Sequence, residues 1–116
     1  MRKVKVKICG LKRAQDIECV NKLLPDYIGF VFAKTKREVT EQQAAQLKAM
    51  LNPQIKAVGV FVNAEIDLIV RLAASRTIDI IQLHGDEDAA YCERLRLQTE
   101  LPIIKAVRVK DAGSFE

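Results

Sequence analysis

Residues 4–16 read VKVKICGLKRAQD, and this stretch decides the fold class. Side chains of a strand alternate between two faces, so Lys7 and Cys9 share one face, opposite the apolar residues at positions 4, 6 and 8. Gly10 allows the backbone to turn directly after Cys9, and a helical pattern of apolar residues follows. Parallel α/β folds carry their chemistry at the carboxyl ends of the strands. The stretch therefore predicts that Cys9 lies in a polar opening at the carboxyl ends of the strands, beside cationic side chains.

Short apolar runs recur along the chain at intervals of 23 to 29 residues, and a helical pattern fills each interval. The predicted strands are residues 4–9, 27–32, 56–62, 80–83 and 103–109. The predicted helices are residues 14–24, 41–51, 64–75 and 87–98. Thr40 and Gln43 form a capping box before the second helix, and Asn63 is expected to cap the third. This alternation of strand and helix predicts a parallel sheet with right-handed crossovers.

Two parallel architectures compete for this pattern: an open doubly wound sheet and part of a (βα)8 barrel. Helices cover both faces of an open sheet, so its central strands should be apolar on both faces. Lys7, Gln82 and Lys105 instead interrupt the predicted strands, and burying an ammonium group under a helix without a partner is costly. The mouth of a barrel can hold such groups facing one another and a ligand. The sequence therefore favours a partial TIM barrel, an α/β fold with four βα units plus a fifth strand.

A closed barrel needs eight strands and roughly 200 residues or more. Residues 1–116 are therefore interpreted as a single incomplete barrel domain whose carboxyl-terminal half is absent from this sequence. Unpaired sheet edges invite other strands, so self-association through the open edges is expected.

Matching glycines occur in the second and third predicted strands, at Gly29 and Gly59. A glycine inside a strand weakens it unless something needs the room. Both glycines are interpreted either as inward positions beneath a ligand pocket or as small residues that let side-chain layers pack tightly.

Composition narrows the class of partner. The net charge of +4 suits either a solvated surface or a small anionic substrate, and the 5% aromatic content offers little on which nucleic-acid bases could stack. The three cysteines have no close spacing, which argues against a disulfide scaffold or a CxxC metal site and is typical of a reducing cytoplasm. The acidic residues 86–88 are interpreted as the start of a helix rather than as metal ligands. No apolar run reaches the roughly 18 residues of a membrane span, so no membrane partner is expected.

Six short motifs in order carry a family resemblance. They are KICGL at 7–11, GFVF at 29–32, TKR at 35–37, VGVFVN at 58–63, IQLHGDE at 81–87 and IKAV at 104–107. The series resembles phosphoribosylanthranilate isomerase, the (βα)8-barrel enzyme of tryptophan biosynthesis. The resemblance implies an Amadori rearrangement of N-(5-phosphoribosyl)anthranilate to 1-(2-carboxyphenylamino)-1-deoxyribulose 5-phosphate, an anionic phosphosugar substrate, and no metal or organic cofactor.

The resemblance also implies roles for individual residues. Cys9 matches the family's general base, which takes a proton from the sugar C2′, and only a thiolate can act as that base. Lys7, on the same strand face, would favour the thiolate. Arg37 matches the arginine that clamps the anthranilate carboxylate, a bidentate pairing that lysine cannot reproduce. His84 is expected to line the substrate pocket as a polar contact.

The family's general acid, an aspartate on a sixth strand, has no counterpart here, and Asp111 does not match its position. The phosphate-binding loops after the seventh and eighth strands are also missing, so the 116 residues alone are expected to be inactive or nearly so. Two alternatives stay open. One is a non-catalytic half-barrel whose edges bind a partner or a second copy, and the other is a flavodoxin-like module that would bury Lys5, Lys7 and Lys105 under helices.

Overall fold

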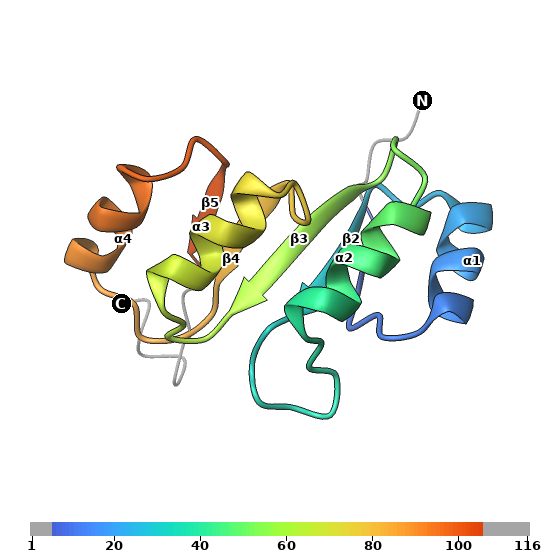
Figure 1. Cartoon of the computed structure of the whole chain (residues 1–116), viewed down its shortest axis with the longest axis horizontal. Helices are drawn as coiled ribbons and strands as arrows, with labels where there is room; N and C mark the ends of the chain where they lie inside the picture. Colours follow the sequence, from blue (N-terminus) through green and yellow to red (C-terminus); the bar gives the residue numbers. More distant parts are fainter. Residues whose placement is uncertain (1–5, 106–116) are drawn as a thin grey trace, which may run out of the picture.

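The computed structural model describes residues 6–105 and shows a parallel sheet in which each of the first four strands is followed by a helix (Figure 1). The elements are β1 Lys7–Cys9, α1 Ala14–Leu23, β2 Tyr27–Val31, α2 Glu41–Met50, β3 Lys56–Phe61, α3 Ile66–Ala74, β4 Ile80–Leu83, α4 Ala89–Arg96 and β5 Ile103–Lys105. Lys5, Asp111 and the predicted strand beyond Lys105 lie outside the described residues.

The strands lie side by side in chain order, β1-β2-β3-β4-β5, and every neighbouring pair is parallel. Right-handed crossovers between successive neighbours put every helix on the same face of the sheet. A doubly wound sheet instead reverses its strand order at a switch point and is covered on both faces. In Figure 1, α2 and α3 lie in front of the sheet. The partial barrel is therefore confirmed, and the flavodoxin-like alternative is wrong for the described strands.

The hydrophobic core lies between the sheet and its covering helices. The strands contribute side chains of at most 2% exposure, namely Ile28, Phe30, Ala57, Phe61, Ile81 and Leu83, and the helices contribute Ile17, Val20, Ala44, Ile69, Leu72 and Leu95. Burying one such large aliphatic or aromatic side chain is worth about 1.5–3 kcal/mol. Because the strand residues recur at every second position, the alternating pattern in the sequence identifies the helix-covered face.

The opposite face of the sheet is the concave one. A hydrogen bond of 2.7 Å joins Lys7 Nζ of β1 to Gln82 Oε1 of β4, across two intervening strands. Three strand spacings of about 4.8 Å would put the two backbones roughly 14 Å apart in a flat sheet, so the contact indicates a curved one. Val58 and Val60 fill the middle of this concave face at 2% and 8% exposure.

The two strand glycines do not share a face. The register pairs Gly29 with Cys9 and Val58, on the concave side, whereas Gly59 pairs with Phe30 on the helix-covered side. Gly29 therefore matches the interpretation as an inward position. Gly59 matches the alternative of tight side-chain packing, because a Cβ there would approach Phe61 to 2.9 Å and Ile78 to 3.0 Å. The two sequences look aligned, but Gly29 is the third residue of its strand and Gly59 the fourth, and an odd shift changes the face.

The predicted capping box of α2 is confirmed by reciprocal hydrogen bonds: Gln43 N donates to Thr40 Oγ1 at 3.0 Å and Thr40 N donates to Gln43 Oε1 at 2.9 Å. The predicted start of α1 at Ala14 is also confirmed, whereas those of α3 and α4 are wrong. The N-cap of α3 is Glu65 rather than Asn63, and α4 begins at Ala89 behind an Asp88 cap rather than at residue 87. In both places the loop between the strand and the helix, at the carboxyl edge of the sheet, is longer than predicted.

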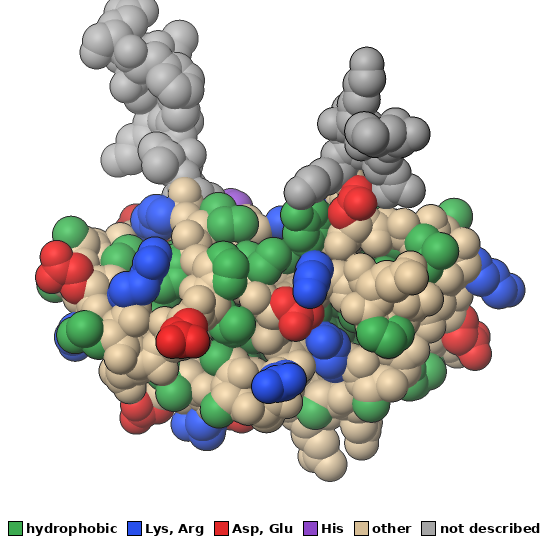
Figure 2. Space-filling model, turned by 90° about the horizontal axis from the view of Figure 1, so that it is seen from above, with side chains coloured by type: hydrophobic (Ala, Val, Ile, Leu, Met, Phe, Trp, Pro, Cys, Tyr) green, Lys and Arg blue, Asp and Glu red, His purple; other side chains and the backbone are tan. Residues whose placement is uncertain are grey.

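One face of the molecule carries charged side chains of both signs. On the face shown in Figure 2, Lys and Arg side chains alternate with Asp and Glu among hydrophobic side chains, without a continuous patch of either sign. Within residues 6–105, no helix is both long and apolar enough to cross a membrane.

Candidate functional site

The Cys9 thiol lies on the concave face at the carboxyl end of β1, where its residue is exposed. Its register partner on β2 is Gly29. A Cβ at position 29 would approach the Cys9 Sγ to 2.6 Å, which no real contact of this kind reaches. The sulfur can therefore occupy this position because Gly29 has no side chain.

Arg37 lies beside the same strand end. Gly10 follows Cys9 with a φ of +85°, and a Cβ there would meet Arg37 Cδ at 2.5 Å and Nε at 3.3 Å. Lys12 Nζ also donates to the Lys36 carbonyl at 3.0 Å, which ties the arginine loop to the turn after β1. The fold thus brings together Cys9 and Arg37, two residues that the sequence singled out separately.

Lys7 shares the concave face with Cys9, two residues before it on β1. Its ammonium group donates to Gln82 Oε1, so the lysine is held toward the opposite side of the curved sheet. This pairing matches the expectation that polar groups inside the barrel satisfy one another. The effect of Lys7 on the thiol stays a prediction.

His84 is exposed and directly follows β4, two residues beyond Gln82. Its backbone N–H donates to the Phe61 carbonyl at 2.8 Å, which extends the ladder between β3 and β4 by one bond. His84 therefore lies on the same carboxyl edge of the sheet as Cys9 and the Arg37 loop. That edge is where barrel enzymes gather their functional side chains.

Glu87 is the residue that the sequence interpretation missed. Its side chain has 0% exposure, whereas the sequence placed it only in the acidic start of a helix. Oε2 accepts from Asn63 N at 2.8 Å, and Oε1 accepts from Gly85 N at 2.9 Å and from Lys105 Nζ at 2.8 Å. One carboxylate thus joins the loops after β3 and β4 to the end of β5.

Lys105 does not line the mouth as expected. Its register partner is Leu83, on the helix-covered side, and its ammonium group donates to both the Glu87 carboxylate and the Gly85 carbonyl. Burial by itself would raise the pKa of Glu87, but the hydrogen bond from Lys105 and those from the backbone N–H groups lower this pKa below its ordinary value. Glu87 is therefore an ionised buried group with its partners in place. The sequence signals this ion pair only weakly, through a lysine in the fifth predicted strand and a glutamate shortly after the fourth.

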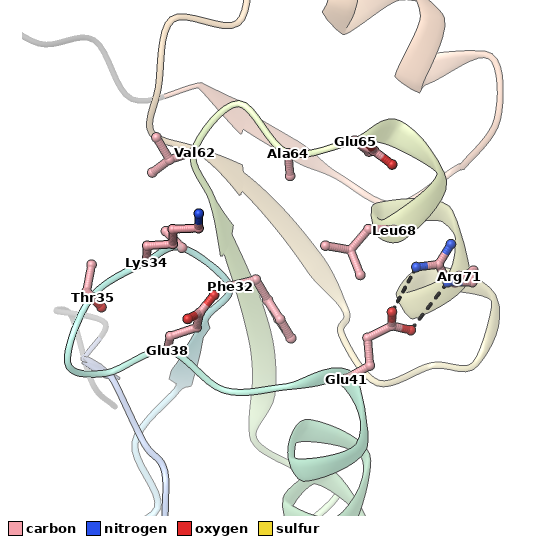
Figure 3. Close-up of a pocket in the computed structure, with 11 residues that line it drawn as sticks. Phe32, Lys34, Thr35, Glu38, Glu41, Val62, Ala64, Glu65, Leu68 and Arg71 are labelled. Carbon is pink, nitrogen blue, oxygen red and sulfur yellow. Dashed lines mark hydrogen bonds and ion pairs between the residues drawn. The ribbon is translucent and has the colours of Figure 1, made fainter.

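A hollow at the same carboxyl edge is lined by a different set of residues, mainly from the segments that follow β2 and β3. It measures about 700 Å³ and lies between the loop after β2 and the start of α3 (Figure 3). Phe32 and Leu68 point toward one another across it, and a 2.8 Å ion pair between Glu41 and Arg71 bounds one end. That hydrogen-bonded guanidinium holds the pKa of the Glu41 carboxyl below its ordinary value. Cys9, Arg37 and His84 are not part of its lining.

Comparison with known proteins gives consistent matches. A family model for N-(5'phosphoribosyl)anthranilate (PRA) isomerase matches residues 6–116. The N-(5'-phosphoribosyl)anthranilate isomerase of Endomicrobium trichonymphae is 51% identical over 107 residues, which make up 92% of this chain and 54% of the relative. The corresponding protein of Lachnoclostridium phytofermentans is 50% identical, covering 92% of this chain and 49% of the relative. The chain thus spans about half the length of the curated relatives it matches.

Solved structures agree with the sequence matches. The phosphoribosyl anthranilate isomerase of Thermotoga maritima superposes with a TM-score of 0.82 at 33% identity, covering 97% of this chain and 54% of that one. A second structure, a phosphoribosyl anthranilate isomerase in complex with reduced 1-(o-carboxyphenylamino)-1-deoxyribulose 5-phosphate, has a TM-score of 0.82 at 33% identity and covers 97% and 57% of the two chains.

Proposed function

Because the chain belongs to the N-(5'-phosphoribosyl)anthranilate isomerase family, we propose that its β1–β5 units carry part of the active site of that isomerase. The reaction is the Amadori rearrangement of N-(5-phosphoribosyl)anthranilate to 1-(2-carboxyphenylamino)-1-deoxyribulose 5-phosphate. The observation that carries the proposal is the exposed Cys9 thiol on the concave face, with the Arg37 side chain packed over the adjacent turn.

In the proposed reaction, a general acid outside this sequence protonates the furanose ring oxygen, and the ring opens to a Schiff base at C1′. The Cys9 thiolate then takes the proton from C2′, and the electron pair of that C–H bond moves toward the Schiff-base nitrogen. The resulting enolamine tautomerises to the ketone product. Because a general base must lie within hydrogen-bond reach of the proton it removes, an open concave face above the sulfur is a requirement of this step.

Substrate binding is assigned to the basic and polar groups at the same edge. The Arg37 guanidinium pairs with the anthranilate carboxylate, whose planar geometry matches two parallel N–H groups. Lys7 and His84 supply further polar contacts to the anionic substrate. We also place the protein in a reducing cytoplasm, since Cys9, Cys19 and Cys92 are all unpaired thiols.

The test is a Cys9→Ala substitution in the complete enzyme, or in this chain complemented by the carboxyl-terminal half of a relative's barrel. General-base catalysis typically contributes about 10²- to 10⁴-fold, so the rate of product formation should fall by that order. Cys19→Ala is the matched control, because Cys19 is an exposed thiol on α1, away from the site. Substantial turnover in the Cys9→Ala variant would remove the base assignment.

A second candidate function is a half-barrel that binds another strand or a second copy at its edges. Within residues 6–105, β1 and β5 each have a paired neighbour on one side only, and Ile104 on the edge strand is 48% exposed. Unpaired edges of this kind favour strand addition. Size-exclusion chromatography over a dilution series tests it, and a monomer at all concentrations would argue against edge pairing.

A further inference from the structure

Three separate strand ends converge on one buried group at the carboxyl edge of the sheet. Glu87 receives the Asn63 N–H from the loop after β3, the Gly85 N–H from the loop after β4, and the Lys105 ammonium from β5. Asn63 itself has a φ of 50° and accepts the Asp86 N–H on its Oδ1 at 2.9 Å. The loops after β3 and β4 are thereby cross-linked twice, once through Glu87 and once through Asn63.

Ionic burial of this kind is a costly way to gain stability. Taking a carboxylate and an ammonium out of water carries a large desolvation penalty, and well-packed apolar residues of similar volume often do as well or better. Here two of the hydrogen bonds come from backbone N–H groups in the loops after β3 and β4, and the loop after β4 carries His84. The network ties the backbones of both loops to one carboxylate through directional hydrogen bonds.

The network fixes the backbone directly after His84. The N–H of His84 itself is bonded to the Phe61 carbonyl. The next residue is Gly85. Its N–H donates to Glu87, and its carbonyl accepts from Lys105. The peptide groups on both sides of His84 are therefore held, while its imidazole side chain is left exposed at the rim.

We propose that Glu87 is a positioning residue of the substrate site: its ionised carboxylate holds the loops after β3 and β4 against β5 and so sets the direction of the His84 imidazole. This inference rests on the proposed function for its catalytic consequence, but not for its structural one. Glu87 does not touch the substrate and acts only through His84.

Glu87→Gln tests the proposal with little change of shape. A carboxamide offers one oxygen and an NH₂ group where the carboxylate accepts from three donors, so at least one donor loses its acceptor. Glu93→Gln is the matched control, because it makes the same change at an exposed glutamate on α4. Circular dichroism establishes that both variants are folded before any further measurement.

The first readout uses the 116-residue chain with ¹³C- and ¹⁵N-labelled histidine, which labels a single residue because His84 is the only histidine. We expect Glu87→Gln to move and broaden the imidazole resonances, while Glu93→Gln leaves them in place. Unchanged resonances in a folded Glu87→Gln variant would overturn the proposal, since a merely structural role would lower stability alone. If Glu87→Gln does not fold, Lys105→Met takes the same test, because the carboxylate then keeps its two backbone donors.

The second readout uses the complete enzyme and separates KM from kcat. A misplaced substrate contact is expected to raise KM roughly ten- to hundredfold with a smaller change in kcat. Equal KM values for Glu87→Gln and Glu93→Gln would also contradict the proposal. If Cys9→Ala retained activity while Glu87→Gln still moved the His84 resonances, the proposed reaction would fail and the positioning role would remain.

Discussion

The two corners of the candidate site are built by different physical means. At the β1–β2 corner, the positions of Cys9 and Arg37 depend on free space. Gly29 and Gly10 have no Cβ atoms, and the two side chains occupy the space that those atoms would fill. At the β3–β5 corner, His84 is placed by charge, through a buried carboxylate and its donors. The comparison shows that one edge of a sheet can position one residue by steric exclusion and another by an ion-centred network.

The largest expected effect concerns the charged corner. Glu87→Ala removes the acceptor of three donors. Breaking a buried ion pair on one side typically costs about 3–5 kcal/mol in the free energy of unfolding, and we expect the low end of that range because the Lys105 side chain is 32% exposed. Glu93→Ala is expected to stay within about 0.5 kcal/mol of wild type, as an exposed surface substitution does. Urea denaturation measures both. A loss of less than about 1 kcal/mol for Glu87→Ala would mean that this corner is held by packing, like the first one.

The next effect concerns the steric corner and uses its two strand glycines as a matched pair. An alanine Cβ would approach Cys9 Sγ to 2.6 Å at position 29, and Phe61 and Ile78 to 2.9 Å and 3.0 Å at position 59. Overpacking of this kind costs about 1–3 kcal/mol, so both variants should be destabilised.

Only Gly29→Ala should change the reactivity of Cys9, because Gly59 faces the opposite side of the sheet. The measurement is the rate of iodoacetamide alkylation of Cys9 in a background in which Cys19 and Cys92 are alanine. Equal alkylation rates in the two glycine variants would show that the sulfur does not depend on the room left by Gly29.

Lowering the pH should weaken the charged corner around Glu87. Because the pKa of Glu87 is lowered in the folded chain from an ordinary value of 4.5, the carboxylate stabilises the fold above about pH 4.5. That contribution is lost as the pH falls through the lower folded pKa, where protonation abolishes the ion pair with Lys105. Glu87→Gln should therefore differ most from wild type at pH 6 and least near pH 3, as judged by urea midpoints. A difference that does not change with pH would indicate that the carboxyl group is already neutral at pH 6.

The steric corner could largely be read from the sequence, and the charged corner could not. Cys9 and Gly10 are adjacent, and the βα repeat makes the strand that contains Gly29 their neighbour, although the register that pairs Gly29 with Cys9 is seen only in the structure. The repeat also gives the strand order and all four helices. The sequence does not decide which face of the sheet Gly59 occupies, because the start of a strand is uncertain by a residue, which is enough to change the face.

The ion network escaped sequence analysis for a different reason. Asn63, Glu87 and Lys105 come from three loops or strand ends, and local pattern assigns each a plausible separate role as a cap, a helix-dipole partner or a barrel-mouth cation. Their convergence depends on exact helix starts, since α4 beginning at Ala89 is what leaves Glu87 in the loop. Capping signals locate a helix start only to within a few residues, which is insufficient to identify such a partner.

The smallest expected effect belongs to a third charged contact, which serves as a reference for the second. Glu41 and Arg71 form an ion pair at 2.8 Å whose side chains are 45% and 58% exposed, at the end of the hollow in Figure 3. Solvent and salt screen an exposed pair, so Glu41→Gln should change the urea midpoint less than Gly59→Ala does. It should leave Cys9 alkylation and the His84 resonances as they are. If Glu41→Gln and Glu87→Gln destabilised the chain equally, burial would not be what distinguishes the network around Glu87, and the contrast between an exposed pair and a positioning carboxylate would fail.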